Sequence, residues 1–189
     1  MRSRAKARIS SRLHRATAAS TALLVASAVH GSSLLDLRIN WTSSAPLGLY
    51  REVAGPPRRG DLGLLCLPPG LESFGRSRGY LWAGSCPGGS SPILKQVVAL
   101  PGDEVDVQQR SVAVNGRFLD CSELHHVDSL GRPLEHVPLG RRKVSDGEAW
   151  VLGVYRERSW DSRYFGPIPA ESIVGLARPL LTLSTGTAH

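Results

Sequence analysis

The amino-acid sequence predicts a mainly β domain that carries two loop-rich excursions and is preceded by one N-terminal apolar helix. From residue 37 onward, short apolar or alternating runs are separated by glycine and proline, which is typical of strands and turns. No long stretch of this part has a convincing 3.6-residue apolar period. The 189 residues suit one domain of ordinary size, and a hydrophobic content of 41% is enough for a core.

Residues 1–36 have the composition of a targeting segment. The first fifteen residues carry six basic and no acidic side chains, and a charge-free run follows from residue 16 to residue 35. Twenty helical residues span about 30 Å, which matches the hydrocarbon core of a bilayer. This layout predicts a secretory signal peptide or a signal anchor, with the rest of the chain outside the cytoplasm. A small-x-small sequence at residues 26–28 leaves cleavage open, and a basic, alanine-rich soluble helix is the alternative.

The excess of positive charge is concentrated in this tip. The whole chain has a formal charge of +7, but six of its 23 basic residues lie in the first fifteen positions, which leaves 17 basic against 16 acidic side chains. A nearly neutral body is a poor partner for a phosphate backbone. We therefore expect no nucleic-acid partner.

Residues 37–189 are expected to form the β-rich domain. Its strands are predicted at residues 97–100, 104–107, 111–114, 149–154 and 173–177. Asn115 and Gly116 both tolerate positive φ, so they predict a tight hairpin turn after the third of these strands. Residues 68–92 and 121–147 are rich in glycine, proline and charge, and they are expected to be loop-rich excursions between strands.

The chain has three cysteines: Cys66, Cys86 and Cys121. Their spacing predicts no metal site, and we expect neither a metal nor another cofactor. In an exported protein one pair is able to form a disulfide. The pair Cys86–Cys121 is favoured weakly because both residues lie in the excursions, and three unpaired thiols are the alternative.

The first segment with chemical potential is residues 40–50. In an extended chain Asn40, Thr42 and Ser44 share one face, since side chains alternate with period two. Pro46 lacks a backbone N–H and restricts the residue before it, so the chain is expected to bend just after Ser44. A hydroxyl at a strand end beside a bend is well placed for nucleophilic attack, although serine-rich turns are common.

The second segment is residues 92–103, where Lys95 lies within an otherwise apolar strand. Twenty of the 23 basic residues are arginine and only three are lysine, which indicates that arginine is unsuitable at position 95. A buried amine has a lowered pKa and is able to act as a general base, which a guanidinium is not. The alternative is an edge-strand lysine whose stem reaches to water.

The third segment is residues 159–166, in which Asp161 and Arg163 have the spacing of a local ion pair. Together the three segments read Ser-x-Pro, Leu-Lys-x-Val-x-x-x-Pro-Gly-Asp and Ser-x-Asp-Ser-Arg-x-Phe-Gly. This order resembles the bacterial signal peptidase I family of serine–lysine proteases. Within that family, Asn-x-Thr-x-Ser-x-Pro-x-Gly-Leu-Tyr at residues 40–50 is most similar to the TraF-type conjugative-transfer peptidases, and the resemblance covers about residues 37–179.

The resemblance implies a signal peptidase I-like catalytic domain with Ser44 as the nucleophile and Lys95 as its general base. Thr42 matches the hydroxyl that helps the Ser44 amide bind the oxyanion. No histidine is needed for such a pair, and none of the six histidines lies in these segments.

The resemblance assigns supporting roles to the third segment. Ser159 matches a hydroxyl that orients the lysine amine. Asp161, together with Arg163, matches the acidic position that holds the site. Because a carboxylate close to the amine would raise the lysine pKa, we expect the charge of Asp161 to be engaged by Arg163.

Three positions depart from the pattern of leader peptidases. Ala45 stands where methionine is usual, Gln96 stands where arginine often follows the lysine, and residues 153–155 lack the common Gly-Asp-Asn sequence. The first and third departures favour the specialised conjugative-transfer branch.

The implied protein is a serine endopeptidase that hydrolyses or transfers peptide bonds of exported pilin or leader-bearing proteins. It is expected at the inner membrane or in the periplasm, with its catalytic domain on the periplasmic side. The alternatives are a housekeeping signal peptidase I and a non-catalytic pilus-assembly scaffold. A self-cleaving repressor of the LexA type is disfavoured because the N-terminal segment leaves no room for a DNA-binding domain.

Overall fold

The structure is a computed structural model that describes residues 36–42, 44–155 and 158–183. The predicted N-terminal helix lies outside these residues. Within the described part, no helix combines the length and the apolar composition needed to span a bilayer. Chain contacts divide the protein into Met1–Leu37 and Arg38–His189, and the elements described below belong to the second unit apart from the first residue of β1.

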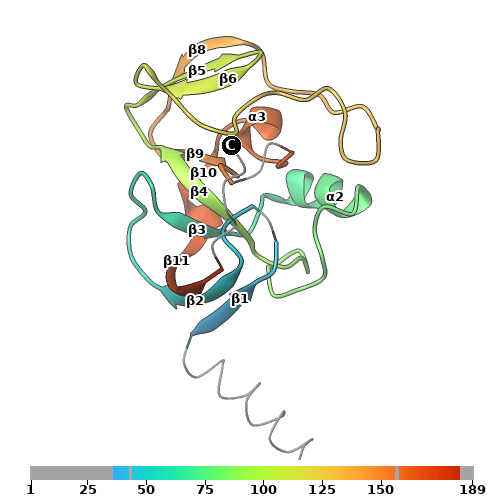
Figure 1. The fold of residues 1–189 in the computed structure, drawn as a ribbon, viewed down its shortest axis with the longest axis vertical. Coiled ribbons are helices and arrows are strands. Elements are labelled where there is room, and N and C mark those ends of the chain that lie inside the picture. The colour runs from blue at the N-terminus through green and yellow to red at the C-terminus, as the bar shows by residue number, and fades with distance from the viewer. Residues whose placement is uncertain (1–35, 43, 156–157, 184–189) are drawn as a thin grey trace, which may run out of the picture. The chain divides into compact units, whose positions relative to one another are not determined.

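The larger of two sheets has seven strands in the order β1-β2-β11-β3-β4-β9-β10 (Figure 1). The neighbouring pairs from β2 to β10 are antiparallel. This sheet bears out the prediction of a mainly β domain. Its strands are β1 (Leu37–Asn40), β2 (Gly48–Val53), β3 (Leu62–Leu65), β4 (Ile93–Ala99), β9 (Glu148–Leu152), β10 (Ile168–Pro169) and β11 (Ile173–Thr182).

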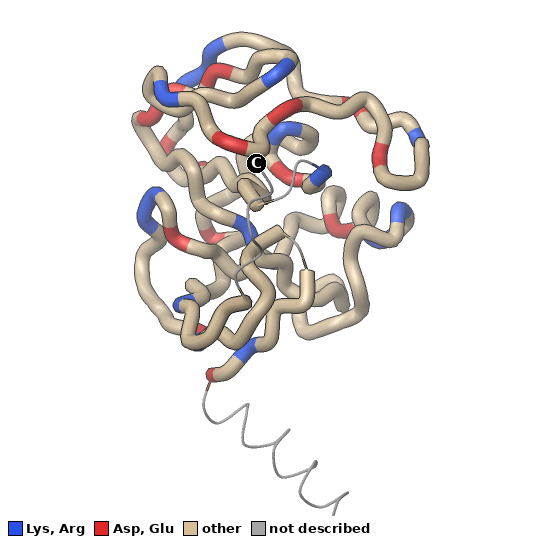
Figure 2. Tube along the Cα trace, viewed as in Figure 1, with Lys and Arg blue, Asp and Glu red and all other residues tan. Residues whose placement is uncertain are grey.

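The smaller sheet has four strands in the order β7-β6-β5-β8. Its strands are β5 (Glu104–Gln108), β6 (Ser111–Val114), β7 (Arg117–Phe118) and β8 (Gly140–Lys143). The predicted turn between β6 and β7 is confirmed, since Asn115 and Gly116 have φ values of 49° and 78° and Val114 pairs with Arg117. Basic and acidic residues are interspersed over the described part of the chain (Figure 2).

The core forms where the two sheets meet and beneath the larger one. Valines that alternate along β5 and β6 are buried, and they pack with Trp150 and Leu152 of β9. A second cluster joins β3, β4, β9 and β10, and it includes Leu65, Val97 and Ile168. Period-two burial therefore decides which faces meet, and it fixes β4 inside the larger sheet, between β3 and β9.

The first excursion is not the loop that its composition predicted. It begins with the helix α2 (Pro69–Ser77), which has proline at its first position, where the missing N–H is harmless. The helix is only nine residues long and contains Gly75, whose added Cβ would approach Leu81 and Trp160 to 2.8 Å. The helix is amphipathic, but its nine residues include one proline and two glycines, which is the composition that led to the prediction of a loop. Two shorter helices follow later in the chain, α3 (Ser162–Phe165) and η1 (Ala170–Ser172).

The disulfide joins Cys66 to Cys86, with a Cα–Cα distance of 5.4 Å. The weakly favoured pair Cys86–Cys121 is therefore wrong. After α2 the chain turns back, and a bridge between Ala83 and Ser90 places Cys86 beside the end of β3. Cys121 is an exposed free thiol. The pairing follows from a turn that the sequence did not reveal.

Candidate active site

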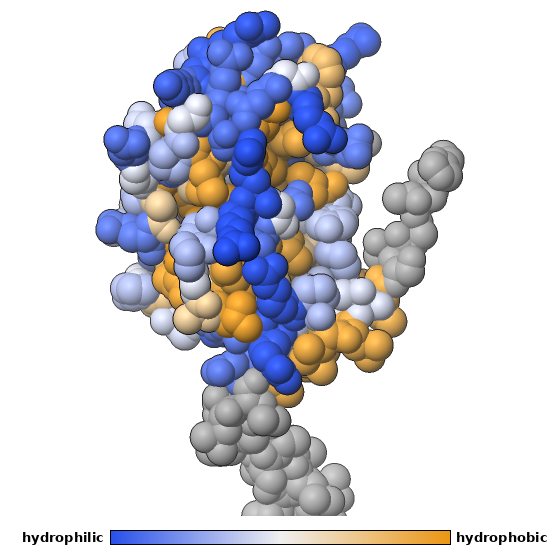
Figure 3. Space-filling view, turned by 90° about the vertical axis from the view of Figure 1, so that its left-hand side faces the viewer, coloured by the Kyte–Doolittle hydropathy of each residue, from blue (hydrophilic) through white to orange (hydrophobic). Residues whose placement is uncertain are grey.

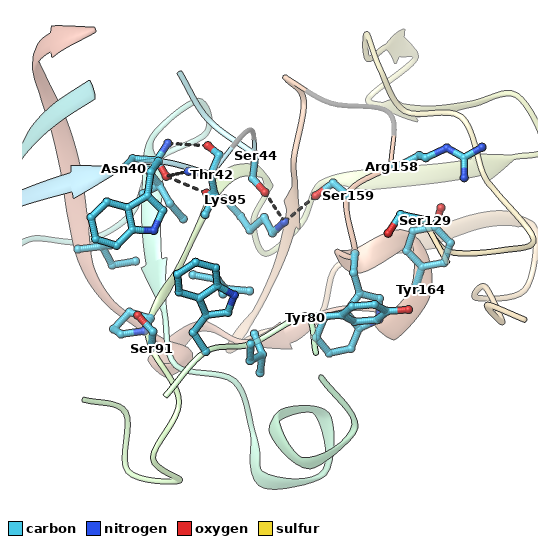
Figure 4. Close-up of a pocket in the computed structure, with 18 of the residues that line it drawn as sticks. Asn40, Thr42, Ser44, Tyr80, Ser91, Lys95, Ser129, Arg158, Ser159 and Tyr164 are labelled. Carbon is cyan, nitrogen blue, oxygen red and sulfur yellow. Dashed lines mark hydrogen bonds between the residues drawn. The ribbon is translucent and has the colours of Figure 1, made fainter. Parts of the chain in front are cut away.

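Residues from all three segments line one cleft of about 560 Å³ in the larger sheet. Ser44, Lys95 and Ser159 lie at its centre, and their side chains point toward one another (Figure 4). The walls also include residues of both excursions, among them Trp82 and Asp128. The topology therefore brings together the positions that the sequence singled out.

The loop that carries Ser44 begins at Asn40, the last residue of β1. The expected extended alternation from Asn40 to Ser44 is wrong, because the chain leaves the strand and folds around the Asn40 side chain. Oδ1 of Asn40 accepts hydrogen bonds from the Thr42 backbone N–H at 3.1 Å and from Thr42 Oγ1 at 2.7 Å. Thr42 lines the cleft, but its hydroxyl donates its proton to Asn40 and not into the cleft.

Further hydrogen bonds hold the rest of this loop. Nδ2 of Asn40 donates to the carbonyl oxygens of Thr42, Ala45 and Pro46 at 2.9, 3.1 and 3.0 Å. The hydroxyl of buried Tyr50 in β2 donates to the Pro46 carbonyl at 2.6 Å. Asn40 and Tyr50 are positioning residues that sequence reasoning missed, although both belong to the quoted motif. They matter because each one satisfies backbone groups that have no strand partner.

Lys95 lies in β4, between β3 and β9, and is 5% exposed. The prediction of a buried amine is confirmed, and the edge-strand alternative is wrong. Nζ donates to Ser44 Oγ at 3.1 Å and to Ser159 Oγ at 2.6 Å. Burial lowers the pKa of Lys95 to about 8, because desolvation disfavours the ammonium form.

Gly153 makes room for the contact between Ser159 and Lys95. A Cβ added at Gly153 would overlap Cβ and Oγ of Ser159 and would lie 3.5 Å from Nζ of Lys95. The sequence showed this residue only as part of a departure at residues 153–155. Its requirement for glycine depends on a side chain six residues further along the chain, and the sequence alone did not reveal it.

Asp161 and Arg163 form a bidentate ion pair, and both side chains are fully buried. Nε and Nη2 of Arg163 donate to Oδ1 and Oδ2 of Asp161 at 2.8 Å each. The Gly153 backbone N–H also donates to Asp161 Oδ2, at 2.9 Å. The expected engagement of Asp161 by Arg163 is confirmed. The carboxylate raises the pKa of Lys95 and the guanidinium lowers it, so the two charges oppose each other and burial decides the direction.

Arg163 also ties the centre of the cleft to the second excursion. Nη1 donates to the carbonyl oxygens of Cys121 and Glu123 at 3.1 and 2.7 Å, and Nη2 donates to the Ser159 carbonyl at 3.1 Å. All five guanidinium donors are arranged in a planar fork, which a lysine does not offer. Arg163 therefore holds the backbone of Ser159 in place while it neutralises the charge of Asp161.

A second carboxylate, Asp128, joins the two excursions at the cleft wall. The Tyr80 hydroxyl donates to Asp128 Oδ2 at 2.7 Å, and Arg132 Nε donates to the same oxygen at 2.7 Å. Burial opposes ionisation of Asp128, but hydrogen bonds from Tyr80 and from the backbone N–H groups of Arg132 and Leu130 outweigh it and hold its pKa well below the usual range. Sequence reasoning had assigned this region to a loop and missed the contact.

The centre of the cleft therefore holds a hydroxyl, an amine with a lowered pKa and a second hydroxyl that orients it. An amine with such a lowered pKa is able to take the proton of a neighbouring hydroxyl near neutral pH without a histidine. Among the described residues, no group of three or more histidine, cysteine, aspartate or glutamate side chains lies close enough to hold a metal ion.

Comparison with known families agrees with this geometry. Residues 10–181 match the model of the signal peptidase family, peptidase S26, and the chain belongs to that family. The resemblance inferred from the three sequence segments is thereby confirmed.

Relatives named TraF match a larger share of this chain than the relative named signal peptidase I-2 does. The plasmid transfer protein TraF of Escherichia coli is 36% identical over 162 residues, which is 85% of this chain and 90% of that protein. A probable conjugal transfer protein TraF of Sinorhizobium fredii is 43% identical over 149 residues, or 77% of each chain. A probable signal peptidase I-2 of Synechocystis is 39% identical over 85 residues, or 45% of this chain and 36% of that protein.

Proposed function

We propose that this protein is a membrane-associated serine endopeptidase that uses Ser44 and Lys95 to process exported pilin or leader-bearing proteins in conjugative transfer. One observation carries the proposal. The amine of buried Lys95 lies 3.1 Å from Ser44 Oγ and 2.6 Å from Ser159 Oγ, in a cleft large enough for a peptide.

The first half of the reaction forms an acyl-enzyme. Neutral Nζ of Lys95 accepts the proton of Ser44 Oγ while Oγ bonds to the substrate carbonyl carbon, and the carbonyl electron pair moves to oxygen. When the pair returns, the C–N bond breaks and the Lys95 ammonium gives its proton to the leaving amine. Ser44 then carries an ester, and Lys95 is neutral again.

The second half releases the product. Lys95 takes a proton from water, the water oxygen attacks the ester carbon, and Ser44 recovers its proton as the C–O bond breaks. An amine of the substrate in place of water would form a new peptide bond by the same proton movements. Hydrolysis and transpeptidation therefore differ only in which nucleophile reaches the ester.

Oxyanion stabilisation is assigned to the Ser44 backbone N–H and the Thr42 hydroxyl. Thr42 Oγ1 donates to Asn40 in the structure, so its O–H must turn away from Asn40 before it donates to an oxyanion. Ser159 orients the lysine amine, and Asp161 with Arg163 positions Ser159. The last two roles are supported by the contacts of these side chains, whereas the oxyanion role rests on the resemblance to the family.

The assignment to conjugative transfer is supported by relatives named TraF that match most of this chain. The alternatives are a housekeeping signal peptidase I, since relatives of that name match 45% and 65% of this chain, and a non-catalytic pilus-assembly scaffold. A scaffold has no use for a desolvated amine beside a serine hydroxyl, since burying an ionisable group without a partner charge destabilises the fold.

Membrane association is supported by exposed apolar side chains beside the cleft. Trp41 and Trp82 line the cleft and are 65% and 66% exposed, and Ile39 in β1 is 66% exposed. Apolar surface is visible toward the end of the domain that carries β1 and β2 (Figure 3). Exposed tryptophan is typical of membrane interfaces, so we place the cleft mouth against the periplasmic face of the inner membrane.

The decisive experiment uses the purified full chain with a prepilin and with a set of leader-bearing preproteins. Ser44→Ala and Lys95→Arg are expected to abolish cleavage, while Ser77→Ala and Lys143→Arg, at exposed positions outside the cleft, retain it. Circular dichroism and thermal unfolding check that each variant is folded. Near-normal cleavage by Lys95→Arg would overturn the assignment of the base, and cleavage of the whole preprotein set would favour the housekeeping alternative.

The topology is tested separately. Protease added to spheroplasts is expected to digest the chain after Tyr50, because the catalytic domain faces the periplasm. Full protection of this region would contradict the proposed location.

A further inference from the structure

The cleft extends to both sides of the amine of Lys95. In Figure 4, Asn40 and Thr42 lie on one side of the hydrogen bonds of this amine. Ser129, Arg158 and Tyr164 lie on the other side, and we call this side the polar half. The lining of the whole cleft also includes apolar side chains, among them Trp41, Trp82, Leu134 and Trp160.

Arg158 brings a positive charge to the polar half. Its side chain is exposed, and Nη1 donates to the carbonyl oxygen of Asp128 at 3.4 Å, which is a long and weak hydrogen bond. Among the described residues, no carboxylate lies within 4.0 Å of the Arg158 guanidinium. Arg158 therefore lines the cleft with a guanidinium that no described carboxylate neutralises.

The carboxylate of Asp128, which also lines the cleft, is committed elsewhere. Its oxygens accept hydrogen bonds from Tyr80, from Arg132 and from the Leu130 backbone N–H. The Arg132 guanidinium also forms a 2.7 Å ion pair with it. Asp128 is thus satisfied within the protein and does not compensate Arg158.

Neutral polar side chains surround Arg158 in this half. Nε2 of His125 is buried in the cleft wall and has no hydrogen-bond partner among the described residues. The Tyr164 hydroxyl accepts the His125 backbone N–H at 3.1 Å, and the Ser129 side chain is exposed in the same wall. A cation with neutral donors around it and no facing carboxylate is complementary to an anionic group.

We propose that the polar half of the cleft binds an acidic side chain of the substrate and that Arg158 is the residue that determines this specificity. The inference rests on the proposed function in that it takes the substrate to be a polypeptide. An aspartate or glutamate near the scissile bond pairs with the Arg158 guanidinium, and a lysine or arginine at the same position is repelled.

Binding is measured with the full chain carrying Ser44→Ala, so that no peptide is consumed. The probes are fluorescein-labelled decapeptides of alanine and serine, capped at both ends, in which a single Glu, Gln or Lys is placed at each position in turn. At one or two neighbouring positions the Glu peptide is expected to bind about fivefold to tenfold more tightly than the Gln peptide, as for a partly exposed ion pair. The preference should shrink in 0.5 M salt, where exposed charges are screened.

Charge reversal identifies the residue responsible. Adding Arg158→Gln brings the ratio of Glu to Gln affinities close to one, and Arg158→Glu reverses the preference in favour of the Lys peptide. Arg110→Gln, which removes an exposed arginine outside the cleft, keeps the Glu preference. Absence of a Glu preference at every position, or a preference that survives Arg158→Glu, overturns the proposal.

The same peptides separate this inference from the proposed catalytic function. They are incubated with the protein in which Ser44 is intact, and cleavage is followed by mass spectrometry. A Glu preference in binding without any cleavage leaves the specificity of Arg158 standing and contradicts the proposed endopeptidase. Cleavage at the same rate with and without Glu supports the proposed endopeptidase and contradicts the specificity of Arg158.

Discussion

The burial of Lys95 makes a quantitative prediction about pH. Burial lowers the pKa of this amine from 10.5 to about 8. At pH 7 about one amine in eleven is then neutral, whereas about one in three thousand is neutral at the ordinary value. The enrichment of a few hundredfold corresponds to about 3 kcal/mol, and it is supplied by the apolar surroundings of β4.

The assay is kcat/KM for a capped peptide without titratable groups, measured from pH 6 to pH 10 at constant ionic strength. The rate is expected to rise about tenfold per pH unit at first, to reach half its maximum near pH 8 and then to level off. Samples returned from pH 10 to pH 8 control for irreversible loss. A rate that still rises about tenfold per pH unit up to pH 10 would show that the amine is not desolvated during catalysis. A rate that falls steadily from pH 6 to pH 9 would refute the neutral-lysine mechanism.

The same pKa difference has a consequence for stability. Between pH 8 and pH 10.5 the unfolded chain binds the Lys95 proton more strongly than the folded chain does, so the free energy of unfolding rises with pH across this window. Below pH 8 the folded protein retains the full destabilisation by a buried ammonium. Lys95→Met is therefore expected to stabilise the protein by about 1–3 kcal/mol at pH 7, as measured by urea denaturation, while it abolishes activity. A loss of stability would contradict this interpretation.

Two further predictions concern the groups that hold the amine in place. Gly153→Ala is expected to displace Ser159 and to lower kcat by about tenfold or more with little change in KM, whereas Gly70→Ala, at a position with open space around it, serves as the matched control. An unchanged kcat for Gly153→Ala would show that the position of Ser159 is unimportant. Asp161→Asn leaves the charge of Arg163 buried and uncompensated, and it is expected to lower the free energy of unfolding by about 3–5 kcal/mol in urea denaturation. A loss below about 1 kcal/mol would mean that the pair is not the buried contact described above.

The centre of the site was predictable from the sequence because its signals are local. Lys95 lies in a strand whose other residues are mostly apolar, and this pattern together with the scarcity of lysine favoured a buried amine. Asp161 and Arg163 are two residues apart, so their pairing requires only a short turn. The hairpin at Asn115 follows from backbone preference in the same way.

Other parts were not predictable because they depend on tertiary contacts. The disulfide of Cys86 depends on where the chain returns after α2. Gly153 is small because Ser159 packs against it, and the Ser44 loop is folded around Asn40 rather than extended. In each case the deciding contact is made by a residue that the local sequence pattern does not select.

The hydrogen bonds of Lys95 to Ser44 and Ser159 have a consequence for the protein before it is folded. The amine meets Ser44 and Ser159 across 51 and 64 residues of chain, so these contacts are absent from a partly folded chain. In that chain the amine is hydrated and keeps its proton at neutral pH, and Ser44 has no base. On the proposed mechanism, completion of folding is itself the activation step, and a newly made chain is unable to cleave its neighbours until its core has closed.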